Sequence, residues 1–334
     1  MKLSELGEIG FLKKIEAFLP LSDKSVLIGI GDDAAAVRVS KGRMLLATTD
    51  LLIEGIHFDL RYTPFYQLGA KALLVNISDI AAMGGIPRYA LIAIAVPDNI
   101  KVAELNELYR GIKKTASSYK VSIIGGDTSA SKKGLMINIT LLGETQEKFI
   151  VRRNGAMAGD KIFITGTLGD SSAGLELLRK SKRSGWLIKR HLMPAPRLKE
   201  ALFIAQNRLA TSMIDISDGL STDLNHICRM SGVGAVIYEE KIPISAGLRK
   251  TRLKRLPLHY ALSGGEDYEL LFTVKEENVK KIYSAILKNR LSATIIGEIT
   301  ERKKGILLVD SKGGQRPLLP TGFEHFKSRI KVIV

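Results

Sequence analysis

The stretch FYQLGAKALLVNISDIAAMGG (Phe65–Gly85) indicates the fold class of this chain. Its length and apolar character predict a helix of about five turns that ends at Gly84 and Gly85, because glycine commonly stops a helix. The runs on either side, MLLATTD (Met44–Asp50) and YALIAIAVP (Tyr89–Pro97), are short and apolar and predict strands. A long helix between two strands indicates an α/β fold, here of the α+β kind.

The rest of the first half repeats this pattern. VSIIGGD (Val121–Asp127) and LMINITLLGE (Leu135–Glu144) predict two more strands. VAELNELYRGIKKTASSYK (Val102–Lys120) predicts an amphipathic helix that becomes basic toward its C-terminal end. Strands and helices therefore mix throughout this half of the chain.

A polar, glycine-containing stretch, TQEKFIVRRNGAMAGDK (Thr145–Lys161), separates the two halves. We place a domain boundary near Glu147, which predicts one domain over residues 1–147 and a second over residues 148–334. In the second half, strand-like and helix-like runs alternate again: KIFITG, TLGDSSAGLELLRK, SMIDISDGLSTDLNHICRM, YELLFTV, EENVKKIYSAILKNR and ATIIGEI. Both halves are thus predicted to be α/β.

The composition is that of a globular protein: 334 residues, of which 45% are apolar. The single cysteine, Cys228, excludes an intrachain disulfide and a cysteine metal cluster, and it fits a reducing compartment. Segment 1–20 is charged throughout and lacks the apolar core of a signal peptide. The longest strongly apolar run, Tyr89–Pro97, is too short to span a bilayer. We therefore expect a cytoplasmic protein without a membrane partner.

The chain is basic, with 50 Lys and Arg against 34 Asp and Glu and a formal net charge of +16. Its densest basic tracts are Lys180–His191 and Arg249–Leu256. Aromatic residues are not interleaved with these charges, as a single-strand binder requires. We interpret both tracts as solvated surface and expect no specific nucleic-acid partner, because charge alone indicates only solubility and nonspecific binding.

Carboxylates within apolar runs are the main functional signal. Solvent-facing acids usually lie among Lys and Arg, whereas these lie among small and apolar residues. The motifs are GIGDDAAAV with Asp32 and Asp33, ATTDLLIEGIHF with Asp50 and His57, LLVNISDIAAMGG with Asn76 and Asp79, IIGGDT with Asp127, MIDISDGLSTDL with Asp215, Ser217 and Asp218, and LSGGEDYELLF with Glu266 and Asp267.

Each motif by itself is more typical of a turn or a helix cap, because Asp, Asn and Ser accept backbone N–H bonds there. Asp79 does not fit that explanation, since Asn76 and Asp79 are three residues apart on one face of an apolar helix, where no cap is needed. His57 by itself is more typical of a half-buried histidine, and Cys228 of a core residue. The sequence carries no Walker A loop and no clear Ser-His-Asp triad.

Buried carboxylates are costly unless they are paired or bind a metal. An oxygen-only ligand set with no cysteine and few histidines suits Mg²⁺ rather than zinc. Mg²⁺ usually binds through carboxylates together with substrate phosphates. Several aspartates facing one cleft therefore indicate a polyphosphate held through several Mg²⁺ ions.

Taken together, the motifs resemble those of the thiamine-monophosphate kinase family. GIGDDAA, TTD, EGIHF, NISDIAAMGG, IGGDT, IDISDGL, SGGEDYEL and GFEHF occur in the family's order between Ile28 and Phe326. The resemblance implies the two-domain architecture of aminoimidazole ribonucleotide synthetase, with an N-terminal mixed sheet that binds ATP and Mg²⁺ and pairs in a homodimer. The C-terminal domain would complete the ATP cleft and the substrate pocket. The implied reaction is ATP-dependent phosphorylation of thiamine monophosphate to thiamine diphosphate.

The resemblance also implies site residues by motif position. The implied Mg²⁺ ligands are Asp33, Thr48, Thr49, Asp50, Asp79, Asp127, Asp215 and Asp218. The implied ATP contacts are Gly126, Asp127, Arg153, Ser217 and, through a looser match, Tyr109. The implied substrate contacts are His57, Glu266 and Phe323.

The chain departs from the family pattern in two places. The family often has Arg-Ser-Gly where this chain has RRNG; the match selects Arg153 as the phosphate contact, and a slip of one residue would select Arg152. Phe323 stands where other members carry tyrosine, which leaves stacking as its implied role.

The implied reaction needs no general base, because the second pKa of a phosphate is about 6 and its terminal oxygen is mostly ionised at pH 7. The obstacle is the approach of two anions, which Mg²⁺ would offset during a direct in-line transfer. Two alternatives stay open: a purine-pathway synthetase of the same superfamily, and a nucleic-acid-binding module. The second leaves the apolar-embedded aspartates unexplained.

Overall fold

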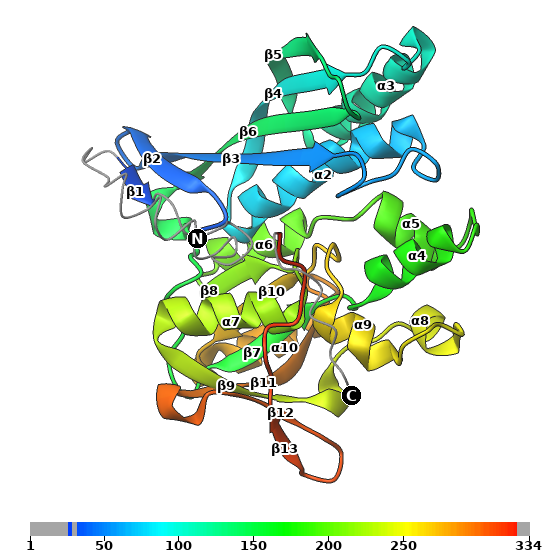
Figure 1. Ribbon diagram of the computed structural model, residues 1–334. Helices are drawn as coiled ribbons and strands as arrows, with labels where there is room; N and C mark the ends of the chain where they lie inside the picture. The colour runs from blue at the N-terminus through cyan, green and yellow to red at the C-terminus, as the bar shows by residue number, and fades with distance from the viewer. Residues whose placement is uncertain (1–25, 29–31, 326–334) are drawn as a thin grey trace, which may run out of the picture.

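The computed structural model describes residues 26–28 and 32–325 of the chain. Segment 1–20, the glycines of GIGDD and Phe326 of GFEHF lie outside the described residues. Two α/β halves, each with its own mixed sheet, lie one above the other in Figure 1. The predicted fold class is therefore confirmed.

The first half is a six-stranded sheet with the strand order β1-β2-β3-β6-β4-β5. Its strands are β1 (Val26–Ile28), β2 (Ala35–Ser40), β3 (Arg43–Ile53), β4 (Ile86–Val96), β5 (Ser122–Ala130) and β6 (Met136–Gln146). Strands β4 and β5 run parallel, and the other neighbours run antiparallel. Helices α2 (Phe65–Ala82) and α3 (Val102–Tyr119) cover one face of this sheet (Figure 1).

The alternation of side chains along β3 decides which residues face α2. Met44, Leu46 and Leu52 are buried against the helix layer, and Thr48 lies in phase with them. Asp50 shares that phase, because successive side chains of a strand point to opposite faces. The other face of the sheet, which we call the outer face, carries no helix among the described residues and exposes 47% of Leu51.

The second half is a seven-stranded sheet with the order β13-β12-β9-β11-β7-β10-β8. Its strands are β7 (Lys161–Thr165), β8 (Ala210–Asp215), β9 (Val233–Tyr238), β10 (Leu270–Val274), β11 (Ala293–Glu301), β12 (Ile306–Val309) and β13 (Gln315–Pro317). Its helices are α4 (Asp170–Arg179), α5 (Trp186–Leu192), α6 (Leu198–Gln206), α7 (Leu220–Ser231), α8 (Ala246–Lys250), α9 (Pro257–Ser263) and α10 (Glu276–Leu287). Apolar side chains of α7 and α9 pack on one face and those of α6 and α10 on the other.

Helix α2 lies between the two halves, because it packs on β3, β4 and β6 and also touches α5, α6 and β8. Almost all of its residues are buried, including the polar Lys71, Asn76 and Ser78. A helix that is buried all round needs a partner for each polar side chain it carries. Two of these residues bond across the boundary: Lys71 pairs with Glu266, and Ser78 donates to Asp215, whereas Asn76 donates to Ala72 within the helix.

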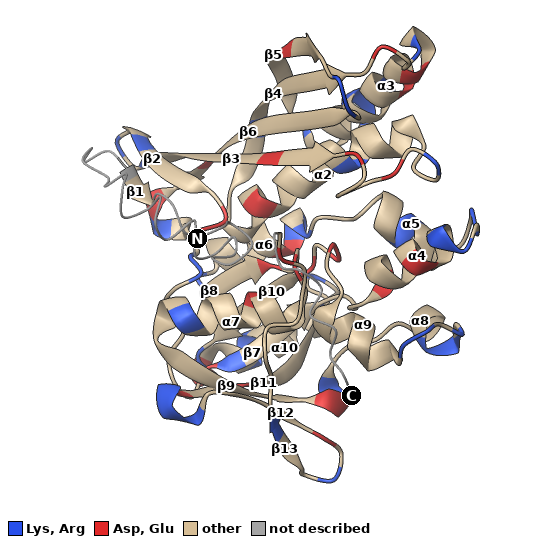
Figure 2. Cartoon of the chain, in the orientation of Figure 1, with Lys and Arg blue, Asp and Glu red and all other residues tan. Residues whose placement is uncertain are grey.

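The interpretation of Lys180–His191 as solvated surface is wrong at its end. This tract connects α4 to α5 and forms most of α5, and Arg190 and His191 are buried because α5 packs against α4 and α2. Arg249–Leu256 is mostly exposed, as expected, and Figure 2 shows its positive charge near α8. Cys228 is buried as predicted. Across residues 26–28 and 32–325, no helix has the length and apolar character needed to cross a membrane.

Candidate active site

Carboxylates from both halves form the centre of the site. Asp79 projects from the last turn of α2, Asp33 lies just before β2, and Asp215 ends β8. One oxygen of each of these carboxylates lies within 4.8 Å of the others. Asp50 on β3 is close enough to act electrostatically on Asp79. The structure thus brings four predicted ligands together, and we call Asp33, Asp50, Asp79 and Asp215 the acid cluster.

Hydroxyl groups donate hydrogen bonds to the acid cluster, while the negative charges of its carboxylates repel one another. Thr48 Oγ1 donates a hydrogen bond to Asp79 Oδ2 at 2.6 Å, and Ser78 Oγ donates to Asp215 Oδ2 at 2.6 Å. Burial, followed by the charge of neighbouring carboxylates, raises the pKa of Asp79 and of Asp215 well above the ordinary value. Burial also raises the pKa of Asp50 to about 6. The ionised cluster is therefore unfavourable unless a cation joins it.

Arg153 supplies one cation. Its Nε and Nη2 donate hydrogen bonds to the two oxygens of Asp33 at 2.9 and 2.8 Å, and Asp32 lies 4.0 Å away. Burial acts to lower the pKa of Arg153, but the ion pair with Asp33 raises it above the ordinary value. Arg152 contributes its backbone oxygen to the N–H of Met213. Of the two adjacent arginines, Arg153 is thus the one whose guanidinium group meets the acids.

The donor set of the acid cluster fits Mg²⁺. Its ligand atoms are carboxylate and hydroxyl oxygens, which hard divalent cations prefer. Arg153 pairs with Asp33 and leaves Asp79 and Asp215 with raised pKa values, so one guanidinium does not balance the cluster. A divalent cation would lower these pKa values by direct attraction.

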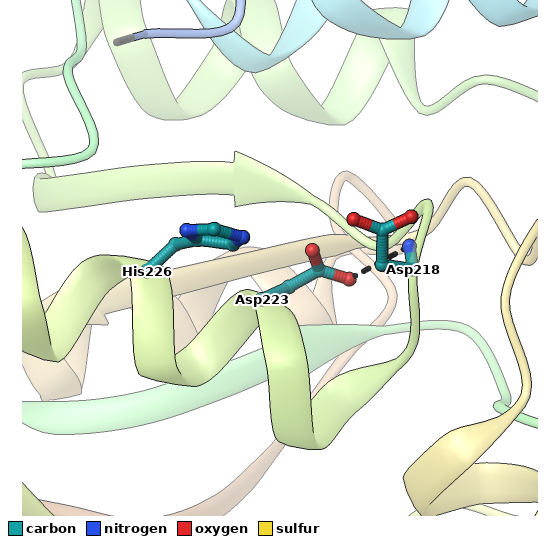
Figure 3. Close-up of side chains that lie close together, drawn as sticks. All are labelled: Asp218, Asp223 and His226. Atoms are coloured by element: carbon teal, nitrogen blue, oxygen red, sulfur yellow. Dashed lines mark hydrogen bonds between the residues drawn. The ribbon is translucent and has the colours of Figure 1, made fainter. Parts of the chain in front are cut away.

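The loop after β8 carries Ser217 and Asp218, and a buried carboxylate holds it in place. Asp223, in the first turn of α7, accepts the backbone N–H of Asp218 at 3.2 Å and that of Gly219 at 3.0 Å (Figure 3). Asp218, Asp223 and His226 each offer one ligand atom, and these atoms lie within 4.8 Å of one another. Burial, then Arg153, lowers the pKa of His226 to about 4, so this imidazole is neutral at pH 7.

Our sequence interpretation missed Asp223 and His226. The signal that could have found them is their spacing, because residues three apart on α7 share a face just after the SDG turn. Figure 3 shows both side chains on the side of α7 that faces the Asp218 loop.

A cavity of about 420 Å³ adjoins these groups. Its lining includes the predicted metal and ATP residues Asp50, Ser217 and Asp218 together with the predicted substrate contacts His57, Glu266 and Phe323. Leu52, Val75 and Leu175 supply apolar wall. We call this cavity the substrate pocket. Six predicted residues from distant parts of the chain thus share one pocket.

Aromatic groups form one wall of the substrate pocket. The rings of Phe323 and His325 are 4.7 Å apart between centroids, and those of His57 and Phe323 are 6.5 Å apart. His57 Nδ1 accepts the backbone N–H of Ile53 at 3.0 Å, and burial followed by His325 lowers the pKa of His57. The backbone N–H of Phe323 donates to the Asp218 carbonyl oxygen at 3.0 Å. This bond ties the aromatic wall to the Asp218 loop.

Thr49 lies on a different face from the acid cluster. It alternates with Thr48 and Asp50, so its side chain points to the outer face of the sheet. There its Oγ1 lies 3.1 Å from Thr140 Oγ1. A role for Thr49 as a metal ligand stays a prediction.

Gly126, Asp127 and Tyr109 also lie away from the acid cluster. Gly126 and Asp127 are on the edge strand β5, and β4 and β6 separate it from β3. Asp127 is paired with Ala93, an outer-face position of β4. Tyr109 is 37% exposed on α3. Their roles in ATP or metal binding stay predictions.

Comparison with known protein families assigns both halves. Residues 31–145 match the N-terminal domain of AIR synthase related proteins, and residues 157–310 match the C-terminal domain of the same proteins. Together these two models cover most of the chain.

Individual relatives are similar over nearly their whole length. The thiamine-monophosphate kinase of Aquifex aeolicus is 40% identical over 98% of this chain and 100% of its own, and that of Buchnera aphidicola from Schizaphis graminum is 39% identical over 96% and 99%. A solved structure described as AaThiL complexed with AMPPCP and TMP superimposes with a TM-score of 0.84, at 39% identity, over 97% of this chain and 99% of that one. Escherichia coli HypE, at 23% identity and a TM-score of 0.70, shares the fold.

Proposed function

Because this chain belongs to the thiamine-monophosphate kinase family and is a phosphotransferase of that kind, we propose a specific course for its reaction. The terminal phosphoryl group of ATP passes directly and in line to the phosphate of thiamine monophosphate, with several Mg²⁺ ions bound at the acid cluster. The observation that carries the proposal is the substrate pocket, where Asp50 and Asp218 share one cavity with Glu266 and Phe323.

In this reaction the side chains of the protein position the substrates and neutralise their charge, and none of them has to transfer a proton. The acceptor phosphate is mostly ionised at neutral pH, so it needs no general base. Bound Mg²⁺ would supply charge compensation for the phosphates of both substrates. Asp33, Asp79 and Asp215 would hold those ions, and Arg153, whose Nε and Nη2 bond to Asp33, would add positive charge beside the phosphates. Ser217 lines the pocket wall, and in this proposal it contacts ATP.

The substrate end of the pocket suits a cationic aromatic ring. Phe323 is 47% exposed and can offer its face for stacking, while Glu266 carries the opposite charge. His57 closes the same wall as a half-buried ring. We assign ATP and metal binding mainly to residues 1–147, and completion of the cleft and the substrate pocket to residues 148–334.

We also propose a cytoplasmic homodimer that pairs through the outer face of the first sheet. Every residue of the edge strand β5 is exposed, including Ile123 and Ile124, and the outer face also exposes Tyr89 and Leu91. Exposed apolar edge strands invite pairing. Pairing there would also cover Thr49 and Asp127, the predicted ligands that lie away from the acid cluster. Light scattering on the purified chain should give twice the monomer mass; a monomer at all concentrations would refute the homodimer.

The test of the reaction is thiamine diphosphate formation from ATP, Mg²⁺ and thiamine monophosphate. Thiamine without its phosphate should be inert, and so should formylglycinamidine ribonucleotide, the substrate class of the related purine enzyme. Asp79→Asn should abolish product formation, whereas Asp98→Asn, at an exposed aspartate outside the site, should not. Turnover of the purine intermediate in place of thiamine monophosphate would overturn the proposal.

A further inference from the structure

Lys71 is an unusual residue to find inside this protein. It lies on α2, is 2% exposed and has buried apolar neighbours such as Leu68 and Val75 along the helix. Lysine is almost never fully buried without a partner. Lys71 has no role in the reaction proposed above.

The partner of Lys71 lies across the boundary between the halves. Lys71 Nζ is 2.7 Å from Glu266 Oε1, and Glu266 Oε2 is 3.3 Å from His191 Nδ1. Burial, then Lys71, lowers the pKa of His191 to about 3, so this imidazole is neutral at pH 7. Lys71 is therefore the charged partner of Glu266. Burial acts to raise the pKa of Glu266, but attraction to Lys71 brings it below the ordinary value.

The backbone holds Glu266 in one orientation. Glu266 adopts φ 66°, a left-handed conformation that costs energy for a residue with a side chain. Its N–H donates to the Ser217 carbonyl oxygen at 2.7 Å, and the N–H of Tyr268 donates to the Ile216 carbonyl oxygen at 2.9 Å. A Cβ on Gly265 would lie 2.4 Å from the Ser217 oxygen, so only glycine allows this close approach. Because the loop is fixed, the carboxylate meets Lys71 on one side and the pocket on the other.

We propose that Lys71 is a positioning residue for substrate recognition: it holds the Glu266 carboxylate, oriented and charged, in the wall of the substrate pocket. The pair has no net charge, and its negative end faces the pocket. A cationic aromatic ring in the pocket thus meets an ionised carboxylate. The ion pair with Lys71 already offsets the desolvation cost of that carboxylate. The proposal rests on the reaction proposed above and adds a residue from the first half to a recognition site that otherwise lies mostly in the second.

The test separates binding of thiamine monophosphate from binding of ATP. Lys71→Met keeps an unbranched side chain one atom shorter and removes its charge, and it should weaken thiamine monophosphate binding, measured by calorimetry without ATP, by about tenfold or more. The KM for ATP should stay within about twofold, since the acid cluster is untouched. Lys71→Arg should restore most of the affinity. Lys113→Met, at an exposed lysine of α3, is the matched control and should bind as wild type does.

A second comparison covers the case in which Lys71→Met fails to fold. Replacing both members of the pair, in Lys71→Met/Glu266→Gln, leaves no buried unpaired charge and should fold. If Lys71 acts through Glu266, the double variant should bind thiamine monophosphate within about twofold of Glu266→Gln alone. Additive losses, equal weakening toward ATP, or wild-type binding by Lys71→Met would each overturn the inference. A wild-type chain that binds thiamine monophosphate but never phosphorylates it would instead refute the proposed reaction.

Discussion

Removing one charge from the acid cluster should stabilise the metal-free protein while abolishing its activity. The pKa of Asp50 is raised from 3.8 to about 6 by burial. That displacement of about 2 pH units makes the ionised form ~3 kcal/mol less favourable in the folded chain than in the unfolded chain. Asp50→Asn keeps the shape and removes the charge. We therefore expect it to raise the free energy of unfolding at pH 8 by up to ~3 kcal/mol.

The sign of the pH dependence follows from the raised pKa. Between pH 3.8 and about 6 the folded chain binds more protons at Asp50 than the unfolded chain, so the wild type loses stability as the pH rises through this window. The raised pKa values of Asp32, Asp79 and Asp215 act in the same direction. The advantage of Asp50→Asn should accordingly fall to about half at pH 5 and vanish below pH 3.8.

Thermal melting in EDTA at pH 5 and pH 8 measures this effect, and a gain of ~3 kcal/mol corresponds to roughly 5 °C or more. Mg²⁺ should raise the melting temperature of the wild type and should do so less for Asp50→Asn. The exposed Asp98→Asn is the control and should change neither quantity. An Asp50→Asn variant that melts below the wild type in EDTA at pH 8, or that keeps its turnover, would show that Asp50 is not a strained metal ligand.

The remaining predictions concern the metal, the pocket, the route of transfer and the buried ion pairs. Activity should need Mg²⁺ or Mn²⁺ and disappear in EDTA; full turnover in metal-free buffer would contradict the ligand assignment. Phe323→Ala should raise the KM for thiamine monophosphate by the loss of ~0.5–2 kcal/mol and leave that for ATP unchanged, and two-substrate kinetics would detect an equal effect on both. Labelled ATP alone should leave no label on the denatured protein, since direct transfer forms no phosphoenzyme. Glu269→Gln should cost ~3–5 kcal/mol by denaturant unfolding, because the carboxylate of Glu269 is fully buried and accepts hydrogen bonds from Arg190, Arg197 and Thr165; a loss below ~1 kcal/mol would refute that account.

The long elements were predictable because their signals are local. The predicted helix Phe65–Gly85 corresponds to α2 (Phe65–Ala82), and the predicted helix Val102–Lys120 to α3 (Val102–Tyr119). Short elements such as β12, β13, α5 and α8 were not predicted, since a few residues carry little periodicity and tertiary packing decides their conformation.

The candidate site was predictable by motif rather than by geometry. Asp79 was identifiable on physical grounds, because a carboxylate on the apolar face of a helix, away from its N-terminus, has no capping role. Lys71 lies on the same helix and was not noticed, since its partner Glu266 is almost two hundred residues away and only the fold brings them together. The orientation of Thr49, in contrast, was predictable from the sequence. Side chains alternate along a strand, so Thr49 points to the opposite face from Thr48 and Asp50.

Helix α2 also bears on the size of molecule that this protein can accept. Lys71, which meets the substrate pocket through Glu266, and Asp79, which joins the acid cluster, are eight residues apart on one continuous helix, a rise of about 12 Å. That spacing belongs to the backbone, so no exchange of pocket side chains can lengthen or shorten it. Deleting one residue between them would also turn one group by about 100° around the axis relative to the other. Selection for a substrate of different length would therefore have to rebuild the helix itself.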